Sequence, residues 1–400
     1  MSEYSGRRGD VIPISASAAR ASRSRGLPDK RIFIREYDHI IFICTIVLVA
    51  FGLVMVLSAS YYAAMHSGGG MYSYFLTQAF GAGLGFVGMV FAATFNHKLL
   101  AKFALVIYAI GILLLILVLT PLGIEYQGAQ RWIVLFGVNF QPSELAKVAT
   151  IIMLANYISK KPDRVNTLRG LLGCLIILGI PIALVMLGRN LSTVIIIGAM
   201  GFVTIFLASP YFWRFAVAGA LAAAGGVAFI IFGPAFRAAR IEAWLDPFAD
   251  PTGVGFQIVQ SLYAVASGGI FGLGFGNSNQ KLYFLPEAQN DFIFAIIVEE
   301  LGLFGAAIVL MLFAILVWRG MRAAMNSRTL LGCLLATGIV TMISVQVIIN
   351  VGVVTNTIPN TGIPLPFISY GGTSIAVMMT AVGILLNISR YQKTPGQGQG

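Results

Sequence analysis

The chain has 400 residues and a formal net charge of +11, and 58% of its residues are hydrophobic while only 10% are charged. Its mean hydropathy is +0.87. Soluble domains of this size carry more charge, and the apolar residues here occur in blocks long enough to cross a bilayer. The composition excludes a soluble enzyme and predicts an all-α polytopic membrane protein, because alternation within the blocks is too weak for a membrane barrel.

Residues 1–37 form a polar, basic segment rich in Ser, Ala, Arg and Gly, without apolar periodicity. This composition predicts a disordered cytoplasmic tail. No short apolar core with a cleavage site follows, so a cleavable signal peptide is not indicated; a transit peptide is the minor alternative. Residues 391–400 are predicted to form a second cytoplasmic tail, after a membrane domain at 38–390.

Ten apolar blocks follow the first tail, and each approaches the ~20 residues that a ~30 Å hydrocarbon core requires. Most Lys and Arg residues fall on one side of this arrangement when the N-terminus is inside. This positive-inside pattern places both termini in the cytoplasm and explains the net charge without a nucleic-acid partner. We therefore predict about ten transmembrane helices, at residues 38–60, 74–94, 98–120, 143–158, 169–187, 190–208, 212–233, 291–318, 330–353 and 367–389.

Two of the outer connections are long. Residues 121–142 join the third and fourth predicted helices, and residues 234–290 form one large extracytoplasmic loop between the seventh and eighth. The large loop contains aromatic residues that a disordered segment would lack. We predict that it folds on the bilayer surface, with a short amphipathic helix near 255–266.

Asp291 stands where the large loop meets the eighth predicted helix, within LPEAQNDFIFAIIVEELG at 285–302. A carboxylate at the mouth of a hydrophobic segment is costly, which predicts a functional role as a general base or charge-stabilising group. The alternative is a helix-terminal acid stabilised by the helix dipole, and the residues alone favour neither. Glu287 is predicted to be a loop contact rather than the base.

Glu299 and Glu300 lie farther along the same helix, about 12 Å and 13.5 Å from Asp291 at ~1.5 Å per residue. Because the two side chains point in different directions, at most one shares a cavity with Asp291. Structural pairing with a basic or amide side chain on a neighbouring helix is the favoured role for both.

Several basic residues lie on the outer side, against the charge bias. Arg131 precedes Trp132, a pair that suits either phosphate binding or simple interfacial anchoring. Lys147 follows a helix start at Glu144, so an acidic partner or a lipid phosphate is expected. The same reasoning applies to Arg189. Lys281 and Arg240 in the large loop are predicted to be solvated.

No Walker loop, HExxH or GxSxG motif occurs, so nothing supports an ATPase, a zinc protease or a serine hydrolase. The cysteines and histidines are scattered without disulfide or metal-ligand spacing. Two function classes fit these observations. One is an enzyme that acts on a lipid-linked, phosphate-bearing substrate, and the other is a transporter or flippase for such a lipid.

Six motifs extend through the chain: RWI at 131–133, FQPSELAK at 140–147, LDPF at 245–248, GFGNSNQK at 274–281, the stretch at 285–302, and GIPLPFISYGG at 362–372. Together they resemble the SEDS family (shape, elongation, division and sporulation) of FtsW, RodA and SpoVE proteins. The resemblance covers about residues 38–392, and the motifs are jointly very specific.

The resemblance implies a peptidoglycan glycosyltransferase that polymerises lipid II, the undecaprenyl-diphosphate-linked disaccharide pentapeptide. It places this activity on the outer face of the bacterial cytoplasmic membrane, with a class B penicillin-binding protein (a transpeptidase) as partner. The family's essential acid maps onto Asp291. A lipid II flippase and a scaffold for the transpeptidase are the alternatives.

In this interpretation Asp291 accepts the proton of a sugar 4-hydroxyl, the anomeric centre inverts, and undecaprenyl diphosphate leaves. Cationic groups should then stabilise the diphosphate. A divalent cation, magnesium or manganese, is a candidate for the same role, although no ligand cluster identifies one. The candidate diphosphate-binding residues are Arg131, Trp132, Lys147, Arg189, Lys281 and Arg240, and the candidate supporting residues are Glu144, Glu287, Glu299, Glu300, Ser369 and Tyr370.

The sequence departs from the family pattern in four places. Gln289-Asn290 stands where His-Thr is frequent, and Tyr283 stands where many division-type members have Glu. PNTG at 359–362 lacks a Lys, and LGRN at 187–190 replaces a stretch that more often contains an acid or Gln. These departures leave open whether the chain serves division, elongation or sporulation.

Overall fold

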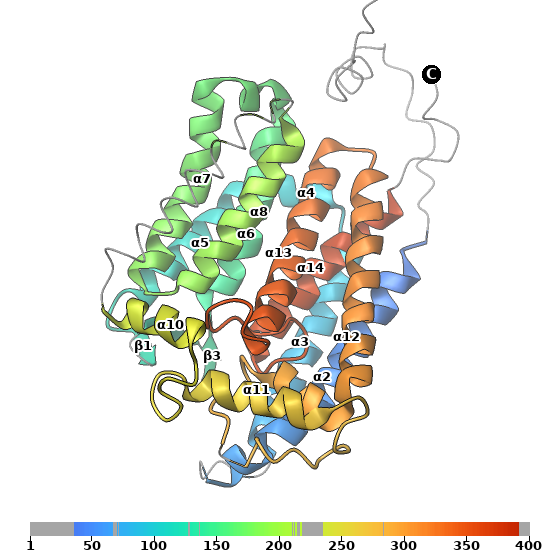
Figure 1. Ribbon diagram of the computed structural model, residues 1–400. Helices are drawn as coiled ribbons and strands as arrows, with labels where there is room; N and C mark the ends of the chain where they lie inside the picture. The colour runs from blue at the N-terminus through green and yellow to red at the C-terminus, as the bar shows by residue number, and fades with distance from the viewer. Residues whose placement is uncertain are drawn as a thin grey trace, which may run out of the picture.

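The computed structural model describes residues 36–391 except 67–69, 71, 127–128, 136, 210, 212, 214–216, 218–234 and 283. Within these residues the chain is mostly helical, and the long helices run side by side along one direction (Figure 1). The predicted helix at 212–233 and nearly all of the two predicted tails lie outside the described residues.

The membrane-protein prediction is confirmed, because seven of the described helices are long and apolar enough to cross a bilayer. Every predicted span that falls within the described residues is largely helical, although residues 367–371 of the last span and 291–292 of the span at 291–318 lie outside helix. The seven helices are α2 (His39–His66), α3 (Ser73–Thr94), α7 (Leu168–Leu187), α8 (Leu191–Ala208), α12 (Ile293–Met325), α13 (Leu330–Val354) and α14 (Gly372–Arg390).

Two further predicted spans take a different form. The span at 98–120 is divided into a short α4 (His97–Lys102) and α5 (Ala104–Val118), with the break at Phe103. The span at 143–158 is α6 (Pro142–Lys160), which is followed by the 3₁₀ helix η1 (Pro162–Asn166). α6 is buried along most of its length and carries charged residues inside the bundle, so its environment is protein rather than lipid.

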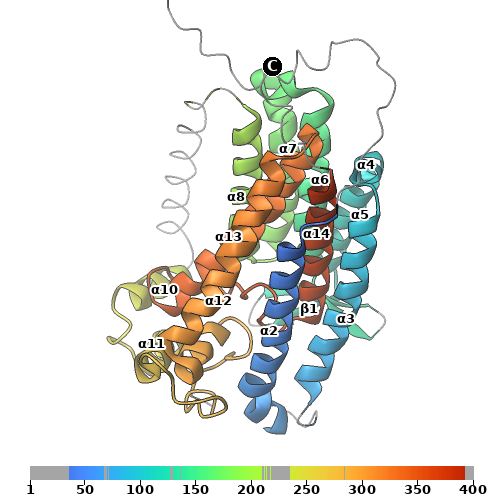
Figure 2. The ribbon, with the colours of Figure 1, turned by 90° about the vertical axis from the view of Figure 1, so that its right-hand side faces the viewer.

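The helices pack closely where small residues face one another. α3 packs along α14, and Figure 2 shows both beside α2. A Cβ added at Gly81 of α3 would lie 2.3 Å from the carbonyl oxygen of Gly372, so only glycine permits this approach. Small residues at helix contacts are the usual means of close packing in membrane bundles.

One end of the bundle, here called the loop end, carries most of the non-helical structure. The connection at 121–142, predicted only as an outer loop, forms a three-stranded antiparallel sheet of β1 (Gly123–Tyr126), β2 (Ala129–Leu135) and β3 (Val138–Phe140). This small sheet is an addition to the predicted all-α membrane fold, which the described helices confirm. The short β2 and β3 strands are joined by a tight turn at Gly137, whose φ is +78°.

The large loop folds across the loop end as two helices, α10 (Ala235–Leu245) and α11 (Phe256–Gly268) (Figure 1). α11 confirms the helix expected near 255–266. Ser261 donates to the carbonyl of Val354 at 2.9 Å, and the Trp244 indole donates to the carbonyl of Asn356 at 3.1 Å. These contacts fasten the large loop to the segment that follows α13.

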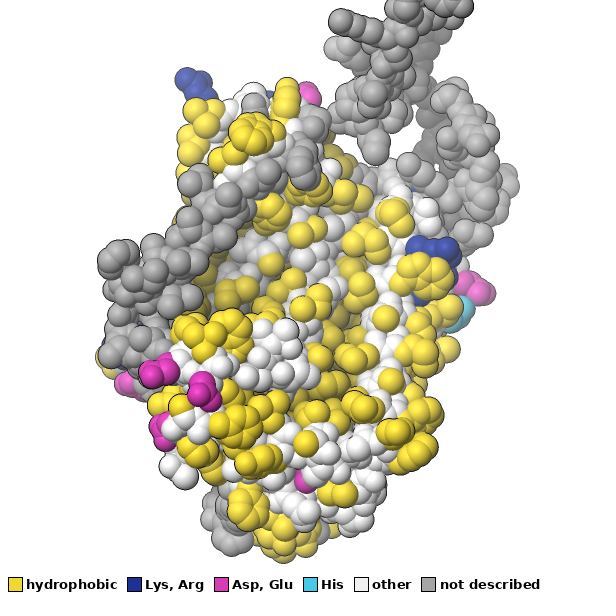
Figure 3. Space-filling model, in the orientation of Figure 1, with side chains coloured by type: hydrophobic (Ala, Val, Ile, Leu, Met, Phe, Trp, Pro, Cys, Tyr) yellow, Lys and Arg dark blue, Asp and Glu magenta, His cyan; other side chains and the backbone are white. Residues whose placement is uncertain are grey.

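The opposite end, here called the terminal end, holds both ends of the described chain. The backbone amide of Asp38 donates to Ser389 at 3.0 Å. The Asp38 carboxylate accepts from Arg319 at 2.5 Å and 2.9 Å, which ties the start of α2 to the end of α12. In the face drawn in Figure 3, Lys and Arg lie toward the terminal end, Asp and Glu lie mainly over the large loop, and hydrophobic side chains fill the band between.

Candidate active site

Asp291 lies at the loop end, in the loop that leads into α12. Its side chain is partly buried, and its backbone is held from two directions. The side-chain amide of Asn350 on α13 donates to the Asp291 carbonyl at 2.7 Å and to the Ile363 carbonyl at 2.8 Å. One fully buried side chain therefore joins the Asp291 loop to the segment before α14.

The segment before α14, residues 360–371, forms the second wall of the site. The Ser369 hydroxyl donates to the Asn290 carbonyl at 2.6 Å, and the Tyr370 amide donates to the Gln289 carbonyl at 2.9 Å. Gln78 of α3 donates to the Ser369 carbonyl at 3.0 Å and accepts from the Gly371 amide at 2.8 Å. Ser369 and Tyr370 thus bind the Asp291 loop through its backbone.

Gly362 lies directly against the Asp291 carboxylate. A Cβ at this position would be 3.1 Å from Asp291 Oδ2, and the glycine has a φ of +69° that side chains rarely adopt. A larger residue would crowd the carboxylate and strain the backbone. Glycine at this position therefore leaves the Asp291 carboxylate without a crowding side chain.

The pKa of Asp291 is raised to about 6: burial is the largest cause, the nearby Glu287 carboxylate also raises it, and Arg131 partly opposes both. Glu287 has a φ of +56°, which is unusual for a residue with a side chain. Its carboxylate accepts from the side-chain amide of Asn290, and its carbonyl accepts from the Asn290 backbone at 2.9 Å. Local hydrogen bonds therefore hold the second acid within electrostatic range of the first.

Arg131 and Trp132 lie on β2, both partly buried. Burial lowers the pKa of Arg131, Asp291 opposes that effect, and Arg240 adds to it. Arg131 and Ser143 line a small cavity, and the Arg131 Nε and the Ser143 hydroxyl are buried there with no hydrogen-bond partner among the described residues. This arrangement leaves donors of both residues available for a water or a ligand oxygen.

The remaining basic candidates differ in their surroundings. Lys147 on α6 forms a buried ion pair with Glu144, with 2.9 Å between Nζ and Oε1, and Ser374 donates to the other Glu144 oxygen at 3.1 Å. Arg240 on α10 is exposed. Arg189 lies between α7 and α8 with a φ of +58°.

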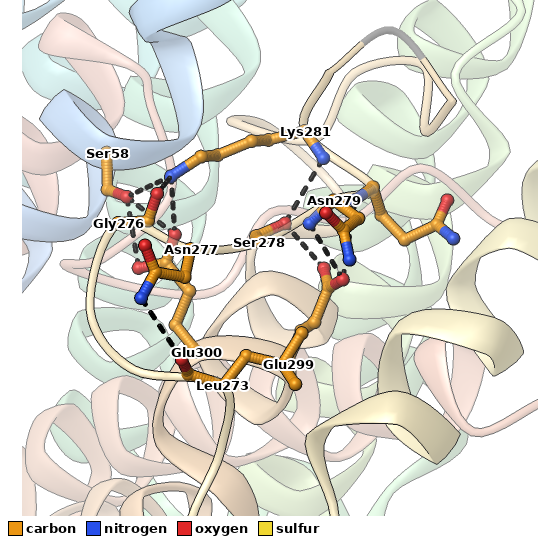
Figure 4. Close-up of polar contacts among 10 residues, drawn as sticks. Ser58, Leu273, Gly276, Asn277, Ser278, Asn279, Lys281, Glu299 and Glu300 are labelled. Carbon is orange, nitrogen blue, oxygen red and sulfur yellow. Dashed lines mark hydrogen bonds and ion pairs between the residues drawn. The ribbon is translucent and has the colours of Figure 1, made fainter.

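Lys281 is not solvated, contrary to the expectation from the sequence. Its ammonium donates to Glu300 at 2.8 Å, to Ser58 at 3.1 Å and to the carbonyl of Gly276 at 2.6 Å (Figure 4). Both Lys281 and Glu300 have little or no exposed side chain. The three donors of the ammonium are thus all used within the protein.

Glu299, the neighbour of Glu300, holds the same loop by a different set of contacts. It accepts from the Ser278 hydroxyl at 2.5 Å and from the backbone amide of Asn279 at 3.0 Å (Figure 4). Glu299 and Glu300 therefore lie apart from Asp291, facing residues 276–281. They stabilise the loop that precedes the site.

α12 is bent between these acids and its long apolar part. Gly302 has φ +70° and ψ −176°. The amides of Leu303 and Phe304 donate to the carbonyls of Gly269 and Ile270 rather than continuing the helix, both at 3.0 Å. In return, the carbonyls of Glu299 and Glu300 accept from Leu273 and Gly274 at 2.9 Å and 3.0 Å.

Three residues of the site were not identified from the sequence. Asn350 and Gln78 are amides inside apolar helices, and a polar residue in such a helix is itself a signal of function or of helix pairing. Gly362 belongs to the motif at 362–372, but nothing in the sequence indicated that it lies against Asp291. Among the described residues, no three His, Cys, Asp or Glu side chains gather into a metal site. Magnesium commonly uses one or two carboxylates together with substrate phosphates, so Asp291 and Glu287 fit a cation only when a substrate supplies the remaining ligands.

The chain is similar to a set of known proteins over most of its length. A family model for FtsW, RodA and SpoVE, described as "Cell cycle protein", matches residues 38–394. Stage V sporulation protein E of Bacillus subtilis (strain 168) is 40% identical over 358 residues, which are 89% of this chain and 98% of that protein. The probable peptidoglycan glycosyltransferase FtsW of Trichlorobacter lovleyi is 39% identical over 360 residues, or 88% and 93% of the two chains.

Solved structures share the fold. A chain from a study of how a peptidoglycan synthase complex coordinates polymerization and crosslinking has a TM-score of 0.73 and 28% identity, covering 89% of this chain and 99% of its own. The rod shape determining protein RodA of Thermus thermophilus has a TM-score of 0.64 and 24% identity, covering 89% and 98%. The second likeness bears on the fold alone.

Proposed function

This chain belongs to the FtsW, RodA and SpoVE family and is a peptidoglycan glycosyltransferase, and we propose that Asp291 is the general base with which it polymerises lipid II. One observation carries this proposal. The Asp291 carbonyl is held by Asn350 of α13, a glycine rather than a larger residue lies against the Asp291 carboxylate, and the pKa of that carboxylate is raised to about 6. A base with a pKa just below neutral is both ionised at pH 7 and able to accept a proton.

The proposed reaction is a single displacement. Asp291 accepts the proton of the sugar 4-hydroxyl of one lipid II, and the oxygen forms a bond to the anomeric carbon of the donor chain. The bond from that carbon to the diphosphate breaks, and undecaprenyl diphosphate leaves with the electron pair. Attack from the face opposite the leaving group inverts the anomeric centre, and water then takes the proton from Asp291.

Arg131 is the best-placed group for the leaving diphosphate. It lies within electrostatic range of Asp291, and its Nε has no partner among the described residues. Lys147 and Lys281 are each paired with a buried glutamate, which makes them weaker candidates. Arg240 and Arg189 stay candidates at the edge of the site. A divalent cation bound with the substrate would add charge stabilisation to the leaving diphosphate.

The charge distribution supports an orientation with the loop end outside the cell. The described Lys and Arg residues lie mainly toward the terminal end in Figure 3, and the positive-inside rule places that end in the cytoplasm. The proposed active site then faces outward from the cytoplasmic membrane. The likeness to a chain of a peptidoglycan synthase complex supports a class B penicillin-binding protein as the cross-linking partner.

Polymerisation of labelled lipid II by the purified protein with its transpeptidase tests the proposal, with wild type compared with Asp291→Asn. Long strands from wild type and none from an equally stable variant are the expected result. Strands from both proteins would exclude Asp291 as the base. If neither protein makes strands but lipid II crosses the proteoliposome membrane faster with the wild type, the protein is a flippase. If the wild type neither makes strands nor moves lipid II but still binds the transpeptidase, it is a scaffold.

A further inference from the structure

A second cavity at the loop end lies between α2 and the loop that precedes the Asp291 segment. Its volume is about 590 Å³, within the range of pockets that hold small ligands. Leu57, Tyr61 and Tyr62 of α2 form one wall, and Phe275, Asn277 and Asn279 lie on the loop side. None of these residues has a part in the proposed proton transfer.

The walls of this cavity are fixed by the buried acids of α12. Lys281 joins Ser58 on α2 to Glu300, and Glu299 holds the backbone at Asn279 (Figure 4). Because Lys281, Ser58 and the loop around Asn279 all line the cavity, its shape is set by hydrogen bonds before any ligand arrives. A pre-formed site loses less free energy on binding than a flexible one.

The charge of the cavity indicates its ligand. Lys281 is the only charged residue among the described residues that line it, and its ammonium is neutralised by Glu300. The cavity therefore offers no spare positive charge for a diphosphate. What it offers is two tyrosine rings, 5.7 Å apart and edge to face, beside exposed asparagine amides. Aromatic faces with amide donors and acceptors suit a neutral, hydroxyl- and acetamido-bearing sugar.

The position of the cavity along the membrane normal agrees with a sugar ligand. α2 has 28 residues and is about 42 Å long at ~1.5 Å per residue, which exceeds the ~30 Å hydrocarbon core. If the core begins near the start of α2, the last turns with Tyr61 and Tyr62 lie above it. Saccharide units, rather than lipid chains, occupy that level.

From these observations we infer that the cavity between α2 and residues 275–282 is a saccharide-binding site for acetamido sugars of the glycan. This inference rests on the proposed function, because a polymerase must hold glycan beside its reacting centre. The sugar comes either from the growing strand or from an incoming lipid-linked disaccharide, and these sources are separable by experiment.

Binding of the neutral N-acetylglucosamine tetramer to the purified full-length protein tests the site without any turnover. The Asp291→Asn protein should bind it as wild type does. Tyr61→Ala and Asn279→Ala should each weaken binding by about tenfold. Tyr72→Ala is the matched control, because Tyr72 is also an exposed tyrosine of the loop end but does not line the cavity, and it should bind normally.

Asn279→Ala keeps the test open if Tyr61→Ala does not fold, since the Asn279 side chain is exposed. Normal binding by both variants, or no binding by wild type, overturns the inference.

Polymerisation by the same variants then identifies the source of the sugar. Shorter strands with an unchanged KM for lipid II indicate the growing strand, and a raised KM indicates the incoming disaccharide; no change in either overturns the inference. A wild type that binds the tetramer but makes no strands would contradict the proposed function alone.

Discussion

Asn350 of α13 and Asp291 are joined by a hydrogen bond of 2.7 Å from the Asn350 amide to the Asp291 backbone carbonyl. The same amide also reaches Ile363. The reactive side chain is thus positioned through its main chain, by a residue that touches no reacting atom. The position of Asp291 depends on α13 as much as on its own helix.

Asn350→Leu should therefore reduce both stability and turnover. The part-buried Asp291 carbonyl and the buried Ile363 carbonyl would both lose their donor, at up to about 1–3 kcal/mol each. Thermal unfolding should show a lower Tm, and kcat should fall more than KM rises. Gln346→Leu is the matched control on the same helix, because the Gln346 Nε2 is buried without a partner among the described residues and its loss should cost little. Equal Tm values for the two variants would show that the two hydrogen bonds of Asn350 do not stabilise the fold.

The pH dependence should report the ionisation of Asp291. Since its pKa is raised to about 6, kcat/KM should fall about tenfold per pH unit below that value and level off above about pH 7. A steady-state profile of lipid II polymerisation from pH 5 to 8.5 measures this directly. A flat profile across pH 5–7 is incompatible with Asp291 as the base.

The same raised pKa has a consequence for stability. The folded protein holds the Asp291 proton more tightly than the unfolded chain, so this residue favours folding below the unfolded pKa near 4, and that contribution is lost as the pH rises through about 6. Asp291→Asn removes the ionisable group. At pH 8 the variant should unfold at the same temperature as wild type or at a higher one, as measured by thermal melting.

Glu287 and Arg131 should move the activity profile in opposite directions. Glu287→Gln removes a negative charge that raises the pKa of Asp291, so the midpoint should shift to lower pH. Arg131→Gln removes the opposing positive charge, so the midpoint should shift to higher pH while the maximal rate also falls. Shifts of the same sign in the two variants would show that neither acts on Asp291 through its charge.

Removing only one partner of the Glu144–Lys147 ion pair should lower the stability of the protein. Lys147→Met leaves the Glu144 carboxylate buried without its partner, for a loss of about 3–5 kcal/mol. Adding Glu144→Gln should restore much of the Tm, because the double variant buries no charge. If the double variant is no more stable than the single one, Lys147 contributes by packing rather than by charge.

Gly302→Ala should destabilise the bend of α12. The backbone angles of Gly302 lie in a region that is essentially confined to glycine, with a penalty of about 1–3 kcal/mol for other residues. A Cβ there would also lie 2.3 Å from the Ile270 carbonyl oxygen. Gly198→Ala on α8, where a Cβ meets nothing within 4 Å, is the matched control and should keep its Tm.

Much of the helical architecture is predictable from the sequence because a lipid environment demands apolar runs of about 20 residues. The described helices match the predicted spans for that reason. The sheet at 123–140 was missed because it is short and contacts protein rather than lipid. Likewise, the bend at Gly302 depends on hydrogen bonds to a loop 30 residues earlier, which no local pattern records.

The site was predictable in part. Asp291 stands out because an acid at the edge of an apolar helix is costly. The pairing of Lys281 with Glu300 was not predictable, since a lysine in a loop is usually solvated and the partner is set by how the loop folds back. The role of Asn350 was not predictable either, because it depends on two backbone carbonyls that come together only in the folded chain.

The exchange of hydrogen bonds at Gly302 divides α12 into two mechanical parts. Both parts, the one just after Asp291 and the one that begins at Leu303, are hydrogen-bonded to residues 269–274. A long helix adapts to a thicker or thinner bilayer by tilting. Because both parts of α12 are hydrogen-bonded to residues 269–274, the angle between them, and with it the position of Asp291 relative to the apolar part of the helix, depends on that loop.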